Sequence, residues 1–276
     1  MMQFYIDDLI KKALLEDINY IDMAADNLLP DDQISKAKFL AKADGVLCGV
    51  DVALRVFELL GSFNIKKLMN DGAHLKKGDI IAEIEGPTKL LLKGERTSLN
   101  LIQHMSGIAT MTNEAAELIK GTNATVTDTR KTLPGLRALQ KYAVTCGGGK
   151  NHRFNLSDAA MLKDNHIDAC GSITKAVSTL RERIGHTVKI EVETRNLDEV
   201  AEALTTGCEI IMLDNMDCET MKKAVEMTAG RALLEASGNI TAETIRPVAE
   251  TGVDIISIGA LTHSVKAFDI SLKISK

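Results

Sequence analysis

The sequence predicts an α/β protein in which a smaller N-terminal α+β sandwich domain precedes a C-terminal domain of the (β/α) barrel type. Three observations lead to this fold class. The 276 residues suffice for roughly two average domains. After about residue 122, short apolar segments alternate with amphipathic ones, and the region before it lacks this alternation. We therefore expect an N-terminal domain over residues 1–105 and a barrel domain over residues 106–276, whose last helix packs back on the first domain.

The N-terminal region reads as strands and helices joined by glycine-containing turns. Apolar residues at helical spacing predict a first helix over residues 6–14, and another is expected near residues 51–60. A long helix from about Glu95 to Lys120, ended by Gly121, is expected to lead into the barrel. The turns between the expected strands lie at Asp44-Gly45, Asp71-Gly72 and Lys77-Gly78.

The C-terminal region repeats one unit, a short aliphatic or β-branched run followed by an amphipathic stretch. Continuous apolar strands of this kind are typical of a parallel sheet that is buried on both faces. Asn196 is expected to cap a helix that Gly207 ends, and Gly185 to close the helix before it. Pro247 lies inside an expected helix over residues 241–251, where it should kink the helix or shift its start. The strands are expected at residues 124–129, 159–163, 188–193, 209–214, 232–237 and 254–259.

The composition excludes several classes of partner and compartment. With 38 acidic against 33 basic residues, 3% aromatic residues and no Trp, the chain is a poor candidate for binding nucleic acid. No apolar run approaches the roughly 18 residues that a membrane span requires. The five cysteines are odd in number and show no C-x-x-C spacing, which favours a reducing compartment. We expect a cytoplasmic protein that binds no membrane.

One segment, residues 129–153, departs from the acidic balance because it contains no Asp or Glu. Its GGGK sequence at residues 147–150 lacks the spacing of a nucleotide-binding P-loop, since Val144 and Asn151 stand where that motif needs Gly and Ser or Thr. The successive glycines are instead expected to let the backbone approach its surroundings closely. The segment predicts a site for a small anionic substrate. Its basic residues are Arg130, Lys131, Arg137, Lys141, Lys150 and Arg153, with His152 beside them.

Polar or glycine residues follow each expected strand of the barrel. The carboxyl ends of barrel strands open onto one face, where loops build the active site. Lys163, Glu193 and Asp214 lie at the edges of apolar runs, where an uncompensated charge is costly, and this favours a functional role. The loops over residues 235–244 and 257–264 place small residues just before an expected helix, a pattern suited to a phosphate group.

Several segments resemble those of the quinolinate phosphoribosyltransferase family, from about residue 38 to residue 264. The resemblance implies transfer of phosphoribosyl from phosphoribosyl pyrophosphate to quinolinate with decarboxylation, which gives nicotinate mononucleotide, pyrophosphate and CO2 in NAD biosynthesis, with Mg²⁺ as cofactor. It also accounts for the basic segment, because arginine forks suit carboxylates and phosphates. The matching segments are ERTSLNLIQHMSGIAT, TRKTLPGLRALQKYAV, GGGKNHRFNLSDAAMLKDNHI, IMLDN, EASGNI and ISIGALTHS.

The resemblance also implies roles for individual residues. Lys131 would serve the pyrophosphate, and Glu193 and Asp214 would lie near the ribose and Mg²⁺, a hard cation that needs oxygen ligands. Together with Lys163, these are the expected catalytic residues. Arg96 would reach in from a neighbouring subunit of a homodimer, with assembly into hexamers left open. Quinolinate would contact Arg130, His152, Arg153 and Lys163, and the 5-phosphate would contact Ser237, Gly238, Asn239, Gly259 and Ala260.

Other functions stay open at this point. A phosphosugar aldolase or isomerase would use Lys163 as a Schiff-base amine, since a strand-end lysine in an apolar run can have a lowered pKa. A related paralogous phosphoribosyltransferase would share part of the same motifs. A binding protein without activity is disfavoured by the intact acidic pair Glu193 and Asp214. The family pattern is not matched at residues 20–26, which leaves the role of that segment undefined.

Overall fold

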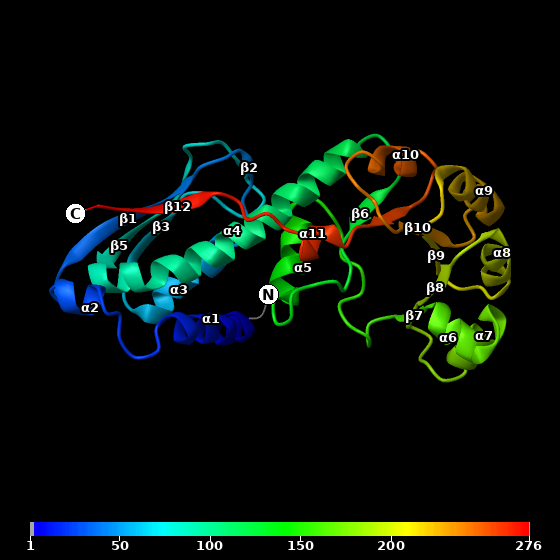
Figure 1. Cartoon of the computed structure of the whole chain (residues 1–276), viewed down its shortest axis with the longest axis horizontal. Helices are drawn as coiled ribbons and strands as arrows, with labels where there is room; N and C mark the ends of the chain where they lie inside the picture. Colours follow the sequence, from blue (N-terminus) through cyan, green and yellow to red (C-terminus); the bar gives the residue numbers. More distant parts are fainter. Residues whose placement is uncertain (1–2, 276) are drawn as a thin grey trace. The chain divides into compact units, whose positions relative to one another are not determined.

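The computed structural model describes residues 3–275, which form two compact units (Figure 1). Unit 1 contains the chain up to Asn113, the segment Leu133–Gly148 and the segment from Ser264 onward. Unit 2 contains Glu114–Thr132 and Gly149–His263. The prediction placed one domain boundary after residue 105, whereas the folded chain returns twice to unit 1.

A four-stranded antiparallel sheet forms the centre of unit 1, in the order β12-β1-β5-β3. In β1, alternate residues such as Ala37 and Phe39 are buried, as expected for a sheet with one face on a core. Phe57 and Leu99 belong to the same core. The strands are β1 (Ile34–Ala41), β3 (Asn64–Lys67), β5 (Ile80–Pro87) and β12 (Ile270–Ser275), and β2 (Gly45–Val46) pairs with β4 (His74–Leu75).

The helices of unit 1 include the longest one of the chain's described part. This helix, α4 (Thr88–Leu118), begins directly after Pro87, earlier than the predicted start near Glu95. The final segment was predicted to be a helix that packs back on the first domain; it does return to that domain, but the predicted helix was wrong. It forms strand β12, which pairs antiparallel with β1 because its alternating apolar residues complete the sheet. The other helices are α1 (Gln3–Asp17), α2 (Ala25–Leu28), α3 (Val50–Leu60) and α5 (Arg137–Cys146).

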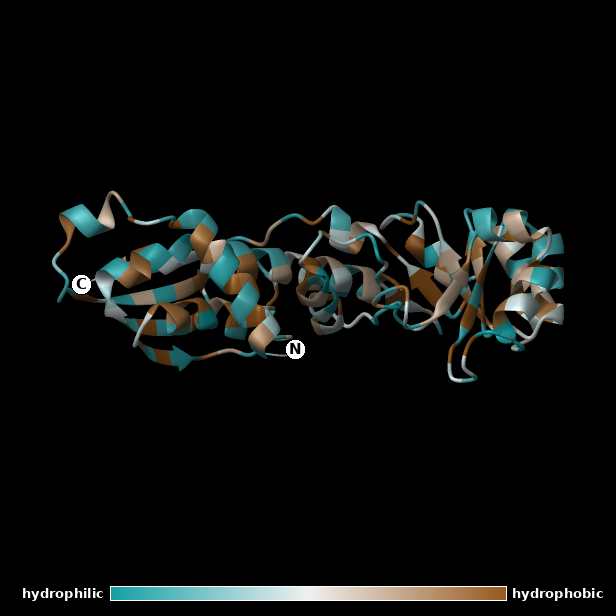
Figure 2. Ribbon diagram, turned by 90° about the horizontal axis from the view of Figure 1, so that it is seen from below, coloured by the Kyte–Doolittle hydropathy of each residue, from teal (hydrophilic) through white to brown (hydrophobic). Residues whose placement is uncertain are grey.

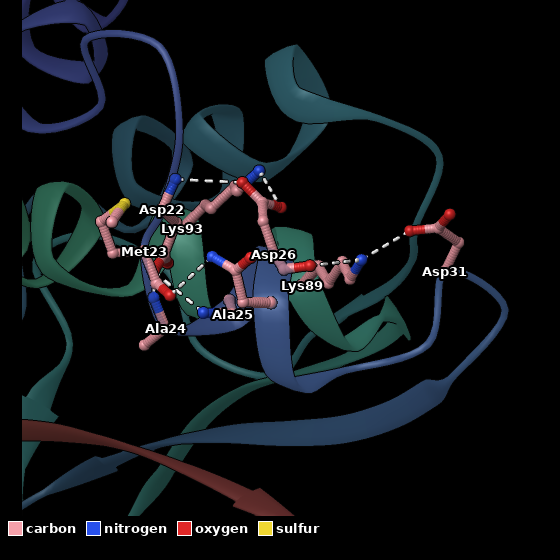
Figure 3. Close-up of polar contacts among 9 residues, drawn as sticks. Asp22, Met23, Ala24, Ala25, Asp26, Asp31, Lys89 and Lys93 are labelled. Carbon is pink, nitrogen blue, oxygen red and sulfur yellow. Dashed lines mark hydrogen bonds and ion pairs between the residues drawn. The ribbon is translucent and has the colours of Figure 1, made fainter.

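The unusual segment 20–26 has a structural explanation within unit 1 (Figure 3). The Asp22 carboxylate accepts hydrogen bonds from the backbone N–H groups of Ala24 and Ala25, each at 2.9 Å, and so begins α2. Asp26 pairs with Lys93 of α4 at 2.7 Å, and both side chains are largely buried. These contacts attach the segment to α4.

A six-stranded parallel sheet forms unit 2, in the order β6-β11-β10-β9-β8-β7. Each of its strands lies within one of the six predicted segments or extends it by one residue. Figure 2 shows apolar residues along the strands of both sheets, as expected for strands that are covered by helices. Within residues 3–275, β6 and β7 are the two edge strands of this sheet. The strands are β6 (Thr125–Thr127), β7 (Ala160–Leu162), β8 (Ile190–Thr194), β9 (Ile210–Asp214), β10 (Leu233–Ser237) and β11 (Ile255–Ser257).

Local sequence signals mark both ends of helix α8 in unit 2. Asn196 accepts a hydrogen bond from the Glu199 N–H at 2.9 Å as the cap of α8, and Gly207 follows that helix with φ 68°. Helix α7 ends at Arg181, before the predicted stop at Gly185. The helices are α6 (Asp164–Cys170), α7 (Ile173–Arg181), α8 (Leu197–Thr205), α9 (Cys218–Thr228), α10 (Ile245–Ala249) and α11 (Ala260–His263).

Pro247 shifts the start of its helix, as predicted, and does not lie in a helix interior. Helix α10 begins at Ile245, so Pro247 lies in the first turn, where its missing N–H has no intrahelical acceptor to lose. Among the described residues, no helix combines the length and the apolar character that crossing a bilayer would need.

Candidate active site

Unit 2 contains a cavity of approximately 290 Å³ at the carboxyl ends of its parallel strands. This is the face where a barrel places its active site. The strand ends and loops therefore converge as the sequence predicted. Of the predicted site residues, those that line the cavity are Arg130, Lys131, His152, Arg153, Lys163, Glu193, Asp214 and Ser237; Thr129, Met161, Met212, Glu235 and Ser257 complete the lining.

The backbone of the basic segment delivers His152 and Arg153 to this cavity. Gly147 packs so closely that a Cβ there would overlap the carbonyl oxygen of Ala109, so close approach is confirmed for this glycine, whereas a Cβ at Gly148 would meet open space. Lys150 then bridges to the end of β6, where its N–H donates to the Val126 carbonyl at 2.9 Å. His152 and Arg153 follow this bridge in the chain and line the cavity.

Two arginines line the cavity, and their positive charges are not fully neutralised by neighbouring acidic groups. Burial lowers the pKa of Arg153, and the positive charge of Arg130 lowers it further. One guanidinium nitrogen of Arg153 donates to the Ala159 carbonyl at 2.9 Å. The Nε of Arg130 is buried and, within residues 3–275, has no hydrogen-bond acceptor. An anion placed between these groups would relieve the repulsion and satisfy the donor.

Lys163 and Glu193 form an ion pair at the edge of the cavity, with 3.0 Å between Nζ and Oε2. The Lys163 side chain is 48% exposed, whereas that of Glu193 is 13% exposed. The expectation that Lys163 is a charge held in apolar surroundings was therefore wrong. It lies one residue beyond β7, where the strand has already reached solvent. Without desolvation, the physical basis for a Schiff-base lysine is lost.

Glu193 and Asp214 belong to neighbouring strands, β8 and β9, and both line the cavity. One oxygen of Asp214 accepts a hydrogen bond from the Asn215 side-chain amide at 2.9 Å. The carboxylate oxygens of this pair are hard ligands and suit Mg²⁺. The donor set is thus compatible with the cation that the sequence led us to expect.

The structure adds two acidic residues that the sequence analysis did not single out. Glu191 and Glu235 are 2% and 1% exposed, and both face His152. The Nε2 of His152 lies 2.9 Å from Glu191 Oε2 and 3.5 Å from Glu235 Oε2. Burial and the negative charge of Glu191 raise the pKa of Glu235 to about 7. Both glutamates interrupt apolar strands, the same signal that drew attention to the strand-end charges.

The predicted phosphate loops line the cavity only at their first residues, Glu235, Ser237 and Ser257, whereas Gly238, Asn239, Gly259 and Ala260 are not part of the lining. Gly238 (φ 101°) and Asn239 (φ 48°) turn the chain after β10, and the Asn239 amide donates to the Asn215 side chain at 3.2 Å. Gly259 packs against the aliphatic part of Lys131, and α11 starts at the next residue, Ala260, as expected. The helix predicted over residues 241–251 was too long, because α10 begins only at Ile245 and ends at Ala249.

Arg96 is located in α4 of unit 1, and the structure does not place it in the cavity of unit 2. It lines a second cavity, of approximately 660 Å³, together with α1 residues such as Tyr5 and Lys12 and the segment Pro134–Leu136. The Tyr5 hydroxyl donates to the Gly135 carbonyl at 2.6 Å and closes one side of this cavity.

Comparisons with known proteins agree along the whole chain. The N-terminal domain of quinolinate phosphoribosyl transferase matches residues 22–106, and its C-terminal domain matches residues 108–273. The probable nicotinate-nucleotide pyrophosphorylase (carboxylating) of Bacillus subtilis strain 168 is 43% identical, with 100% of this chain and 95% of that protein covered. The corresponding protein of Methanocaldococcus jannaschii is 42% identical, with 99% of each chain covered.

Solved structures give the same result for the fold. The crystal structure of NadC from Streptococcus pyogenes superposes with a TM-score of 0.97 at 43% identity and covers 100% of this chain and 98% of that one. The nicotinate-nucleotide pyrophosphorylase from Francisella tularensis has a TM-score of 0.96 at 40% identity, with the same coverage. With both domain families matched in order and relatives above 40% identity over their full length, the chain belongs to the quinolinate phosphoribosyltransferase family.

Proposed function

We propose that the protein transfers phosphoribosyl from phosphoribosyl pyrophosphate to quinolinate and decarboxylates the product, which yields nicotinate mononucleotide, pyrophosphate and CO2 for NAD biosynthesis. One observation carries the proposal: a single cavity brings together two partly buried arginines, Arg130 and Arg153, and a carboxylate pair on neighbouring strands. The first group suits a dicarboxylate and the second suits a developing sugar cation with its metal. The full-length relatives with this activity in their names support it.

Quinolinate binding is assigned to the cationic side of the cavity. Arg130 and Arg153 can each hold a carboxylate through two parallel N–H donors, and the Arg130 Nε provides a donor that is already desolvated. Lys163 contributes a third positive charge, and its pairing with Glu193 holds the ammonium in place before the substrate arrives. His152 is assigned to the same substrate.

The acidic pair is assigned to the sugar. Displacement at the anomeric carbon passes through a state with positive charge on the ribose ring, which the carboxylates of Glu193 and Asp214 stabilise. When bound by these residues, Mg²⁺ would neutralise the pyrophosphate group. Lys131 is assigned to the same pyrophosphate. The turn Ser237–Asn239, with the start of α11 at Gly259 and Ala260, is assigned to the 5-phosphate.

Decarboxylation follows from the charge that ribosylation creates. Transfer makes the ring nitrogen cationic, so the neighbouring carbon can keep the electron pair when the 2-carboxylate leaves as CO2. Direct contact of that carboxylate with partly desolvated cations orients it for departure. The free thiols of all five cysteines agree with a reducing compartment, and we assign the enzyme to the cytoplasm.

Incubation of the purified protein with quinolinate, phosphoribosyl pyrophosphate and Mg²⁺ is expected to form nicotinate mononucleotide. Mass spectrometry of the quenched mixture measures the product, and ¹⁴C at the 2-carboxylate measures the CO2. Nicotinate in place of quinolinate is the matched control for the cation-rich site. A covalent adduct after borohydride reduction with sugar phosphates would favour the aldolase alternative, and binding of quinolinate without pyrophosphate release would favour a binding protein or a paralogue.

A second expected result concerns assembly, because we propose a two-fold dimer in which Arg96 enters the neighbouring subunit's cavity. Arg96→Ala and Lys163→Ala should each be inactive alone. After subunit exchange, activity should return to roughly a quarter of the parent, since about half of the dimers are mixed and each of these has one intact site. Mass spectrometry of the intact assemblies verifies the exchange. If activity stays at background in exchanged dimers, Arg96 does not act across subunits.

A further inference from the structure

The buried carboxyl group of Glu235 is not used by the reaction steps assigned above, although it lines the substrate cavity. It lies in β10 and is 1% exposed. Its Oε1 is buried and, within the described residues, has no hydrogen-bond partner. A buried carboxylate without a full set of donors is costly, so the side chain favours the neutral acid. A neutral carboxylic acid that faces a reaction cavity is a proton donor.

The charges around Glu235 keep it in this form. Glu191 of β8 and Asp128, which follows β6, both repel a negative charge on Glu235. His152 and the hydroxyl of Ser257 in β11 favour the ionised form, but burial and Glu191 outweigh them, and the pKa rises to about 7. Asp214 of β9 and the cations described above also line the cavity. The acid is therefore poised to lose and regain a proton near neutral pH.

The proposed reaction requires such a donor. When the bond between the ring carbon and the 2-carboxylate breaks, CO2 leaves and the electron pair stays on that carbon, beside the cationic nitrogen. The carbon must gain one proton as CO2 leaves, to give nicotinate mononucleotide. None of the permanently charged cavity cations is suited to this task, because Lys and Arg hold their protons tightly at neutral pH.

We infer that Glu235 is the acid that protonates the ring carbon vacated by CO2, an inference that rests on the proposed function. In this step the C–C bond to the departing CO2 and the O–H bond of Glu235 break together while a C–H bond forms on the ring, so that Glu235 is left as a carboxylate. Repulsion from Glu191 then favours uptake of a proton from water, which resets the site. His152, between the two glutamates, holds the carboxyl groups in position.

The test separates ribosyl transfer from decarboxylation in a single turnover. Glu235→Gln keeps the shape and the hydrogen-bonding capacity of the side chain but supplies no proton. Pyrophosphate should still form at close to the parental rate, whereas CO2 and nicotinate mononucleotide should lag by about a hundredfold or more. Equal rates of pyrophosphate and CO2 release, whether normal or reduced together, would overturn the inference. A parent protein that forms no nicotinate mononucleotide would refute the proposed function instead.

A second variant tests the same acid without removing it. Protonated Glu235 is the active form, so the decarboxylation rate should fall as pH rises through its pKa, about 7. Ser257→Ala removes a hydroxyl that favours the ionised form, and this should move the alkaline limb to higher pH. The assignment would be contradicted if the alkaline limb stayed at the parental pH in Ser257→Ala. It would also be contradicted if the limb persisted in Glu235→Gln, since a merely structural glutamate would change the limb in neither variant.

Discussion

Replacing Arg153 with alanine is expected to lower kcat/KM for quinolinate by roughly thirtyfold to several thousandfold, which corresponds to about 2 to 5 kcal/mol. The reason is that the variant leaves one substrate carboxylate unpaired in a partly desolvated site. Lys163→Ala should lower kcat/KM to a similar extent, because it removes a positive charge assigned to quinolinate and also the ion pair with Glu193. Steady-state kinetics with varied quinolinate measures both effects.

Arg195→Ala provides a matched control for Arg153→Ala. Arg195 also belongs to unit 2, but it is exposed, pairs with Glu199 at 2.7 Å and does not line the cavity. An exposed pair contributes up to about 1 kcal/mol, so this variant should retain activity within about fivefold of the parent. If Arg153→Ala kept the parental kcat/KM, Arg153 would not belong to the quinolinate site.

Asp214→Asn and Glu193→Gln are each expected to lower kcat by about a hundredfold to a thousandfold, with quinolinate affinity largely kept. Both changes remove a negative charge that would stabilise the ribose cation and hold Mg²⁺. The Mg²⁺ concentration for half-maximal activity should rise in both variants, and chelation of the metal should abolish the parental activity. Calorimetry with quinolinate and an activity titration with Mg²⁺ measure the two properties separately.

Glu219→Gln serves as the control for the acidic pair, since Glu219 is exposed in α9 and forms an ion pair with Lys223 at 2.7 Å, outside the cavity lining. Its kcat and its Mg²⁺ response should match those of the parent. If Asp214→Asn lost quinolinate affinity and kept its Mg²⁺ dependence, Asp214 would belong to the quinolinate site and not to the ribose and metal site.

The periodicity of the chain was sufficient to predict the architecture of unit 2. Strands β6 to β11 appear as apolar runs because a parallel sheet is covered on both faces, and that requirement acts on each strand separately. The cap at Asn196 and the stop at Gly207 are local in the same sense, since each concerns hydrogen bonds or backbone angles within a few residues. Elements of this kind can be read without knowledge of the rest of the fold.

Predictions failed where distant partners decide the structure. The last segment alternates apolar and polar residues over a short run, and only the free edge of β1 makes it strand β12 instead of a helix. Helix α10 was also predicted too long, although here the cause is local: residues 242–244 form a turn, and Pro247 favours a helix that starts within the turn before it. The exposure of Lys163, by contrast, depends on where β7 ends relative to its neighbours.

The sequence by itself determined the fold class, the six strands of unit 2 and a set of charged strand-end residues that meet at one face, because these follow from local burial and from the common direction of parallel strands. Only the tertiary structure decided which charges meet and in what environment. The contact of His152 with Glu191 and Glu235 joins three segments that are far apart in the chain. Strand register and burial set their separation, and burial with a neighbouring negative charge makes Glu235 an acid, a property of the folded cavity and not of any one segment.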